Sequence, residues 1–316
     1  MQLATPPLLT RLEGASHVLL AGAGGGYDVF ASIPLATHLL TQGKRVTFAN
    51  LTFTYLGGTD ADYVAPHVAR VTPDTAGEDR YFPERSLSRW LRSRELDPTV
   101  YALEKVGVRP LTAAYRHLVA HTGADAIVLV DGGTDILMRG DEAGLGTPQE
   151  DIASLAAVHA LSVPTKLVAC LGFGVDTFHG VCHAHFLENT AALDREGAFL
   201  GAFSVPRASH EGAPYLDAVE SAHRDHPARV SIVNASIAAA LRGDFGDVPL
   251  SERTRGSELF INPLMTMYFG YELDAVARRC VYLPLLKHTE SIFDVSLVLE
   301  GFRHEVSLRP RRSIPH

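Results

Sequence analysis

The sequence predicts an α/β protein with a doubly wound, mostly parallel sheet covered by helices on both faces, a Rossmann-like three-layer sandwich. Short apolar runs typical of buried strands alternate with segments of helical periodicity, and three of these runs end in glycine. No repeat, low-complexity tract or linker divides the chain, so we expect a single domain over residues 1–316.

The first three elements form a β-α-β unit. Residues 16–23, SHVLLAGA, are a nearly continuous apolar run, as in a strand buried on both faces. Residues 28–43 place apolar side chains at helical spacing and end in glycine. Residues 44–53 are rich in β-branched and aromatic side chains, which favours a second strand. The glycine turn therefore lies at the carboxyl end of the first strand.

Residues 55–100 interrupt this pattern with a polar, turn-rich stretch. We expect an insertion after the second strand, with a short helix near residues 86–94. Long insertions in compact α/β proteins often form lids, and a plain surface excursion is an equal alternative.

The remaining chain resumes the alternation of strands and helices. Strands are expected within residues 125–133 and 165–174. Helices are expected within residues 109–123, 148–161, 183–197, 214–226, 232–243, 264–280 and 291–306.

Charge and composition exclude several function classes. The net charge of −8 argues against broad capture of nucleic acid or anionic membranes, and the basic residues 309–316 are interpreted as a frayed terminus.

The chain has no apolar run near the roughly 20 residues of a membrane span, and residues 1–14 lack the pattern of a signal peptide. Cys170, Cys182 and Cys280 form no CxxC pair, as in a reducing compartment. We expect a cytoplasmic protein that binds a small-molecule substrate and could form a homo-oligomer.

Three loops are predicted to build the functional site. The carboxyl ends of parallel strands share one edge of a sheet, and ligands bind there where the strand order reverses. Residues 24–28, 131–147 and 172–185 follow the three glycine-terminated strands and are dense in Gly, Asp and His. We therefore expect these loops to meet at one place.

The glycine turn does not fit a dinucleotide-binding fingerprint. The position of the third glycine is taken by Tyr27 or Val29, depending on the register, and the second strand closes with Asn50 instead of an acid. Gly24, Gly25 and Gly26 can still let a substrate approach the backbone, or can serve only close packing of helix on strand. Asp28 is either an ordinary helix-start acid or a ligand to a sugar hydroxyl, an amine or a metal.

The second loop separates into a structural part and a candidate functional part. Thr147, Pro148 and Glu150 match a capping box, and Asp151 is interpreted as a first-turn acid of the same helix. Paired carboxylates can divide acid and base roles or hold a divalent cation. The candidate catalytic residues are Asp131 and Asp135, and the candidate substrate-binding residues between them are Gly132, Gly133 and Thr134.

Further along this loop, Arg139 either forms a salt bridge with Asp141 or clamps an anionic group of the substrate. Glu142 is grouped with these two residues as a candidate binding residue.

The third loop gathers three histidines within seven residues. Asp176 is a candidate substrate-binding residue. Alternatively, Asp176 with His179, His183 and His185 could ligate a metal, since zinc sites commonly combine histidines with a carboxylate. His179 or His183 could instead act as a general acid or base. Cys182 beside His183 could be a nucleophile, although no sequence feature activates it.

These motifs resemble the bacterial and archaeal family catalogued as domain of unknown function 1152. The resemblance extends over roughly residues 15–305 and implies one domain, but no established activity. It implies that the following residues belong to family motifs: Asp28, Asp131, Asp135, Arg139, Asp141, Glu142, Asp176, His179 and His183.

We expect an enzyme that acts on a small polar metabolite, which is nucleoside-like, sugar-like or phosphorylated, by hydrolysis or a related bond cleavage. A divalent metal ion is a candidate cofactor. The alternatives are a dinucleotide-dependent oxidoreductase and a non-catalytic nucleotide-binding regulatory module.

Overall fold

The computed structural model describes residues 5–250 and 259–314. The strands in these ranges are β1 His17–Gly22, β2 Arg45–Leu51, β3 Asp62–Ala65, β4 Val68–Val71, β5 Val100–Leu103, β6 Ala126–Asp131, β7 Thr165–Leu171, β8 Phe199–Ser204, β9 Gly246–Asp247, β10 Phe260–Ile261 and β11 Met267–Glu272. Within the described part of the chain, nine of them form one sheet in the order β3-β4-β5-β2-β1-β6-β7-β11-β8, and β9 pairs with β10.

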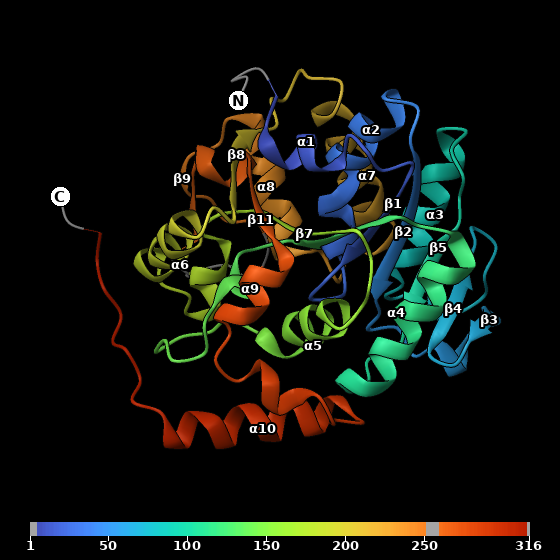
Figure 1. Ribbon diagram of the computed structural model, residues 1–316. Helices are drawn as coiled ribbons and strands as arrows, with labels where there is room; N and C mark the ends of the chain where they lie inside the picture. The colour runs from blue at the N-terminus through green and yellow to red at the C-terminus, as the bar shows by residue number, and fades with distance from the viewer. Residues whose placement is uncertain (1–4, 251–258, 315–316) are drawn as a thin grey trace.

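Helices cover both faces of the sheet (Figure 1). One face carries α4 Val108–Thr122, α5 Pro148–His159, α6 His183–Arg195, α9 Leu273–Arg279 and α10 Ile292–Glu305. The other face carries α1 Pro7–Leu12, α2 Ile33–Thr41, α3 Pro83–Ser93, α7 Gly212–Asp225 and α8 Ile232–Arg242. The 3-10 turns include η1 Asp28–Ser32, η3 Asp135–Leu137 and η4 Val175–His179. The predicted three-layer α/β fold is confirmed.

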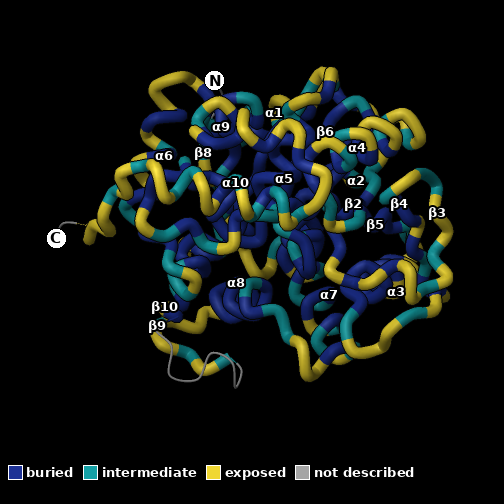
Figure 2. Tube along the Cα trace, turned by 90° about the horizontal axis from the view of Figure 1, so that it is seen from below, coloured by how far each residue is buried: buried dark blue, intermediate teal, exposed yellow. Residues whose placement is uncertain are grey.

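The central strand β1 explains why its sequence is apolar without alternation. Leu19 and Ala21 belong to the core under α4 and α5, whereas Val18 and Leu20 belong to the core under α2 and α7. All four side chains are fully buried, so both faces of the strand require apolar residues. Figure 2 shows this buried interior enclosed by exposed segments.

The strand order reverses between β1 and β6. Five neighbouring strands lie parallel, in the order β5-β2-β1-β6-β7. From β1 the chain adds β2 and then β5 on one side, and it then returns to add β6 on the other side of β1. At this reversal Gly22 is flanked by Asn50 of β2 and Val130 of β6. Asp131 follows at the end of β6, so polar residues gather at the position where such sheets bind ligands.

The segment 55–100 is more integrated than the sequence predicts. Helix α3 confirms the expected short helix, but β5 is a parallel strand of the main sheet, and β3 and β4 extend the sheet antiparallel beyond it. Each of these three strands has only four residues, too few for a pattern to stand out from a turn-rich stretch.

The helix expected over residues 264–280 is wrong in its first half. β11 lies antiparallel between β7 and β8, and only α9 after it is helical. Tyr268, Phe269 and Tyr271 favour a strand. Gly270 packs so closely on α1 that a Cβ there would lie 2.5 Å from the Leu8 Cδ1 atom. This contact joins segments that are far apart in the sequence.

The C-terminal segment is docked, and not frayed from residue 309 onward, because residues 309 and 312 contact the body of the protein. The Arg309 N–H donates to the Asp141 carbonyl at 2.7 Å, and the Ala143 N–H donates to the Arg309 carbonyl at 2.9 Å. The Arg309 guanidinium contacts the carboxylates of Asp141, Glu142 and Glu188. Residues 315–316 of the basic stretch lie outside the described residues.

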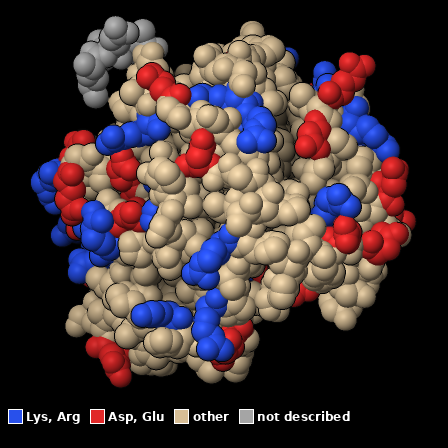
Figure 3. All heavy atoms as spheres, turned by 45° about the vertical axis from the view of Figure 1, so that its right-hand side comes forward, with Lys and Arg blue, Asp and Glu red and all other residues tan. Residues whose placement is uncertain are grey.

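A membrane-spanning helix must be both long and apolar. No helix in the ranges 5–250 and 259–314 has both the length and the apolar character needed to cross a bilayer. All three cysteines are free and buried. Acidic and basic side chains are interspersed on the face shown in Figure 3.

Candidate functional site

A cavity of about 760 Å³ lies at the reversal of strand order. The three predicted loops meet there. Their lining residues are Gly24, Gly25, Gly26 and Asp28 after β1, Asp131, Gly132, Asp135, Thr147, Glu150 and Asp151 after β6, and Asp176 and His179 after β7. The wall is completed by Tyr27, Gln149, residues 53–55, 78, 80–81 and 105, and residues 229–233, which lie before and in α8. Parts of the segment 55–100 therefore border the cavity.

The glycine turn is shaped around carboxylates. The Gly24 N–H donates to Asp28 Oδ2 at 2.8 Å. A Cβ on Gly24 would lie 2.6 Å from Asp151 Oδ2 and 2.7 Å from Asp28 Oδ2. A side chain at position 24 would thus displace both carboxylates, and glycine is required by this close approach.

Asp135 and Asp176 are fixed by donors of neighbouring loops. Asp135 Oδ2 accepts from the Thr147 N–H at 2.8 Å and faces the Thr147 hydroxyl. Asp176 Oδ2 accepts from the Thr134 N–H and hydroxyl. Gly133 permits the contact between Thr134 and Asp176, since a Cβ at position 133 would lie 2.5 Å from Asp176 Oδ2. Gly133 and Thr134 therefore support the cavity from behind and do not line it.

Several residues of the cavity were not among the candidates from the sequence: Phe53, Tyr55, Arg80, Lys105, Arg229 and Asp151, of which Asp151 was assigned only to the start of a helix. The predicted capping box is absent, because Thr147 caps no N–H of α5 and bonds to Asp135, while Glu150 lies 3.4 Å from Lys105 Nζ. Asp151 points into the cavity, and Ser154 Oγ one turn later donates to the Ala23 carbonyl at 2.8 Å. No sequence signal separates Asp151 from an ordinary first-turn acid, because its burial depends on how α5 packs.

The cavity floor is strongly acidic. Burial, followed by the neighbouring charge of Asp135, raises the pKa of Asp28 to about 8. Burial also raises the pKa of Asp135 to about 6. Burial and mutual repulsion raise the pKa values of Asp131, Asp151 and Asp176 well above their usual range. The floor therefore gathers more carboxyl groups than can ionise together at low cost.

The mouth of the cavity has the opposite character. Arg80, Lys105 and Arg229 line it with exposed side chains. Aromatic rings lie among them: Tyr55 is 82% exposed, and the Lys105 ammonium lies 5.0 Å from the centroid of the Phe53 ring. Cationic and aromatic groups thus face solvent together with the exposed carboxylate of Glu78, while the aspartates of the floor lie deeper.

Asn50 holds the glycine turn from the side of β2. Its Nδ2 donates to the Gly26 carbonyl at 2.8 Å and to Glu84 Oε1 at 2.7 Å. Both side chains are fully buried, and burial raises the pKa of Glu84 to about 7. The residue that closes β2 therefore supports the turn and does not reach into the cavity.

Glu84→Gln is expected to gain stability relative to the wild type as the pH rises. The pKa of Glu84 is about 7 in the folded protein, whereas its ordinary value is 4.5. The protonated carboxyl therefore contributes its full stability to the folded protein below pH 4.5, and this contribution is lost as the pH rises through 7. Glutamine keeps the acceptor for Asn50 and cannot ionise. Between about pH 5 and pH 8 the difference in unfolding free energy should move by about 1–3 kcal/mol in favour of the variant.

Urea unfolding at several pH values measures this difference. Glu300→Gln on the exposed side of α10 is the control, and should stay within about 0.5 kcal/mol of the wild type throughout. A pH-independent difference for Glu84→Gln would show that the carboxyl is already ionised in the folded protein.

The histidines do not assemble as a metal site. His179 lines the cavity, but the His183 ring stacks on Phe173 with centroids 4.9 Å apart, and burial lowers its pKa. His185 is 1% exposed and also absent from the lining. The Cys182 thiol donates to the Arg312 carbonyl at 2.9 Å, away from the cavity. The expected set of Asp176 with three histidines is therefore not brought together.

Arg139, Asp141 and Glu142 also lie apart from the cavity. Arg139 Nη1 is 3.6 Å from Asp141 Oδ2, which is the salt-bridge alternative. Glu142 is fully buried and accepts from the N–H groups of Arg139 and Gly140. Asp141 and Glu142 bind Arg309 of the C-terminal segment. Arg139 lies beside them, outside the cavity lining, so it is not placed to clamp a ligand in the cavity.

Comparison with protein-family models matches residues 59–305 to a family described as protein of unknown function (DUF1152). The match covers most of the chain but begins after the glycine turn. No curated protein and no solved structure matches the chain.

Proposed function

Since this chain belongs to the DUF1152 family, whose description assigns no activity, we propose a function from the site: an enzyme that binds a phosphorylated, ring-bearing metabolite in the cavity and cleaves one of its bonds by hydrolysis. Nucleotides and sugar phosphates are the substrate classes with these features. The observation that carries the proposal is the pairing of an acidic floor with a cationic and aromatic mouth in one cavity.

This pairing favours a ligand with two chemically different ends. A phosphate group would be repelled by the carboxylates of the floor and attracted by Arg80, Lys105 and Arg229 at the mouth. Phe53 and Tyr55 offer apolar faces to a base or sugar ring. The volume of about 760 Å³ lies within the range of small-molecule sites.

The deeper residues suit bond cleavage. Asp131 and Asp135 would bind a hydroxyl of the substrate or orient the attacking water, because carboxylates accept strong hydrogen bonds. His179 at the same cavity would exchange a proton with the substrate, since imidazole can both donate and accept protons near neutral pH. His183 has no catalytic role in this proposal, because its ring stacks on Phe173 and does not line the cavity.

A dinucleotide-dependent oxidoreductase has less support. A pyrophosphate in the glycine turn would need the Gly24 N–H, which already donates to Asp28, and would meet the carboxylate of Asp151. Asn50 stands where an acid would bind the ribose hydroxyls, and its amide is committed to Gly26 and Glu84.

A thermal-shift screen of phosphorylated metabolites and their unphosphorylated counterparts tests the proposal. We expect nucleotides or sugar phosphates to raise the melting temperature, with about 2.7 kcal/mol of stabilisation at 100 times the dissociation constant. The unphosphorylated counterparts should bind more weakly. Incubation with the best ligand should give a cleavage product detectable by mass spectrometry.

Matched variants locate the binding. Lys105→Met and Arg229→Met should each weaken binding by about 10-fold, whereas Arg195→Met, an exposed arginine at the end of α6 outside the cavity, should not. No stabilisation by any phosphorylated compound would contradict the substrate class. Binding without product would contradict the enzyme and favour a non-catalytic binding module.

A further inference from the structure

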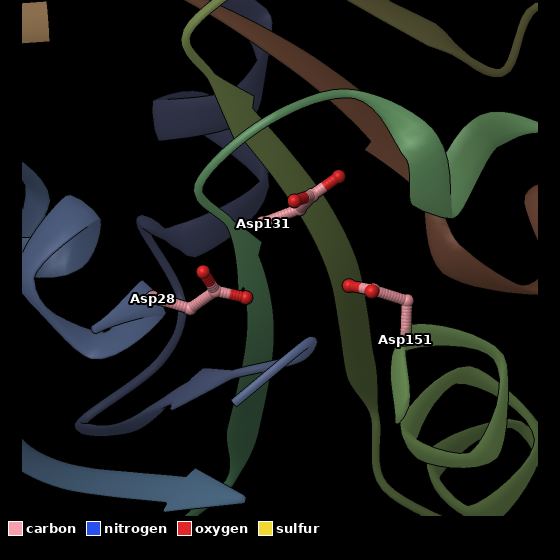
Figure 4. A group of neighbouring side chains, drawn as sticks. All are labelled: Asp28, Asp131 and Asp151. Carbon is pink, nitrogen blue, oxygen red and sulfur yellow. The ribbon is translucent and has the colours of Figure 1, made fainter. Parts of the chain in front are cut away.

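Asp28, Asp131 and Asp151 come from three different segments and converge on one space (Figure 4). Asp28 begins η1, Asp131 ends β6 and Asp151 lies in the first turn of α5. In Figure 4 the carboxylates of Asp28 and Asp151 point toward each other, and Asp131 lies between and above them. One oxygen of each lies within 4.8 Å of the others.

We infer that these three carboxylates form a binding site for one divalent cation that prefers oxygen ligands, Mg²⁺ or Mn²⁺, at the floor of the cavity. Oxygens around an octahedral Mg²⁺ at about 2.1 Å lie roughly 3 to 4.2 Å apart. Small rotations of three side chains with mutual distances up to 4.8 Å reach this geometry.

An unsatisfied buried oxygen points independently to a ligand. Asp151 is 3% exposed, and its Oδ1 has no hydrogen-bond partner among the described residues. In the same ranges of the chain, Asp28, Asp131 and Asp151 take part in no ion pair with a lysine, arginine or histidine: the ion pairs there join other residues. A buried carboxylate left without a partner is costly, and a cation shared by three of them removes that cost.

The neighbouring acids Asp135 and Asp176 lie outside the group whose oxygens are within 4.8 Å of one another. Each has an oxygen held by a backbone N–H, from Thr147 and Thr134, as Asp28 and Asp131 do from Gly24 and Ile136, whereas Asp151 Oδ1 has no such donor among the described residues. Asp135 and Asp176 fix the loops around the site and add negative charge, and they are not needed as ligands.

The donor set selects the kind of cation. Three carboxylates without imidazole or thiolate favour a hard cation over zinc. The group lines the cavity, so water and a substrate oxygen can complete the coordination. Only this last role depends on the proposed function, in which the cation would contact the substrate near the bond that is cleaved.

Titration of the chelator-treated, full-length protein with Mn²⁺ in the absence of substrate tests the site. Electron paramagnetic resonance of free Mn²⁺ should report about one bound equivalent, displaced by Mg²⁺. Asp151→Asn should weaken Mn²⁺ binding by at least about 30-fold, because it removes a charged ligand. Glu300→Gln removes one negative charge from the exposed side of α10, outside the cavity, and should change the affinity by less than about threefold.

Asp28→Asn gives a second test should Asp151→Asn fail to fold, and it should show the same loss. The inference is overturned when the wild type binds less than about a tenth of an equivalent, or when Glu300→Gln weakens binding as much as Asp151→Asn. Phosphorylated ligands that bind to a protein that takes up no Mn²⁺ would leave the proposed function standing and remove the cation site. Stoichiometric binding of Mn²⁺ without binding of any phosphorylated metabolite would keep the cation site and contradict the proposed function.

Discussion

Asn50→Asp is expected to lower the free energy of unfolding by about 3–4 kcal/mol near pH 8. Asn50 is fully buried, and its amide donates to the Gly26 carbonyl and to Glu84 Oε1. Aspartate cannot donate when ionised, so the Gly26 carbonyl loses its partner. Two buried carboxyl groups would also come within hydrogen-bond distance of each other.

The loss should be smaller near pH 6, because the two carboxyl groups can share a proton there. The wild-type pKa of Glu84 is already about 7, and a second carboxyl would raise it further. Urea unfolding at the two pH values measures both effects.

The double variant Asn50→Asp with Glu84→Gln is the control. It keeps one charge and returns one amide donor between the two positions, so it should recover at least about half of the lost stability. A double variant less stable than Asn50→Asp alone would show that the contact between the two side chains is not the cause.

Arg309→Met is expected to destabilise the protein by about 2–3 kcal/mol. The guanidinium donates to Asp141 and Glu142 at 3.0 Å and also contacts Glu188. Its removal leaves the charge of the fully buried Glu142 without this cation, although the neutral donors of Arg139, Gly140 and Asn189 remain. Methionine keeps much of the apolar stem, so the change reports mainly on charge.

Hydrogen exchange gives a second readout for this variant. The N–H groups of Ala143 and Arg309, which pair the C-terminal segment with residues 141–143, should exchange faster. Arg312→Met is the control, since its side chain forms no ion pair with a described residue, and should change stability by less than about 0.5 kcal/mol. A similarly small effect for Arg309→Met would mean that the segment is held by its backbone contacts alone.

Much of the site could be predicted because topology alone brings its loops together. Asp28, Asp131, Asp135 and Asp176 each follow a glycine-terminated parallel strand, and such strands end at one edge. Asp151 could not be assigned in this way, since a first-turn acid is an ordinary feature of a helix. Its role depends on how α5 is rotated, and the bond from Ser154 to Ala23 contributes to that rotation.

The sequence by itself determined the layers of this protein and the edge where its acids gather. Continuous apolar runs require burial on both faces, and strand-helix alternation then leaves a parallel sheet with a common carboxyl edge. Only the tertiary structure decided which polar residues face the cavity. Asp141 and Glu142 are as polar as Asp135, yet they bind Arg309, more than 160 positions away. Contacts over such separations depend on the packing of distant segments, which no local pattern encodes.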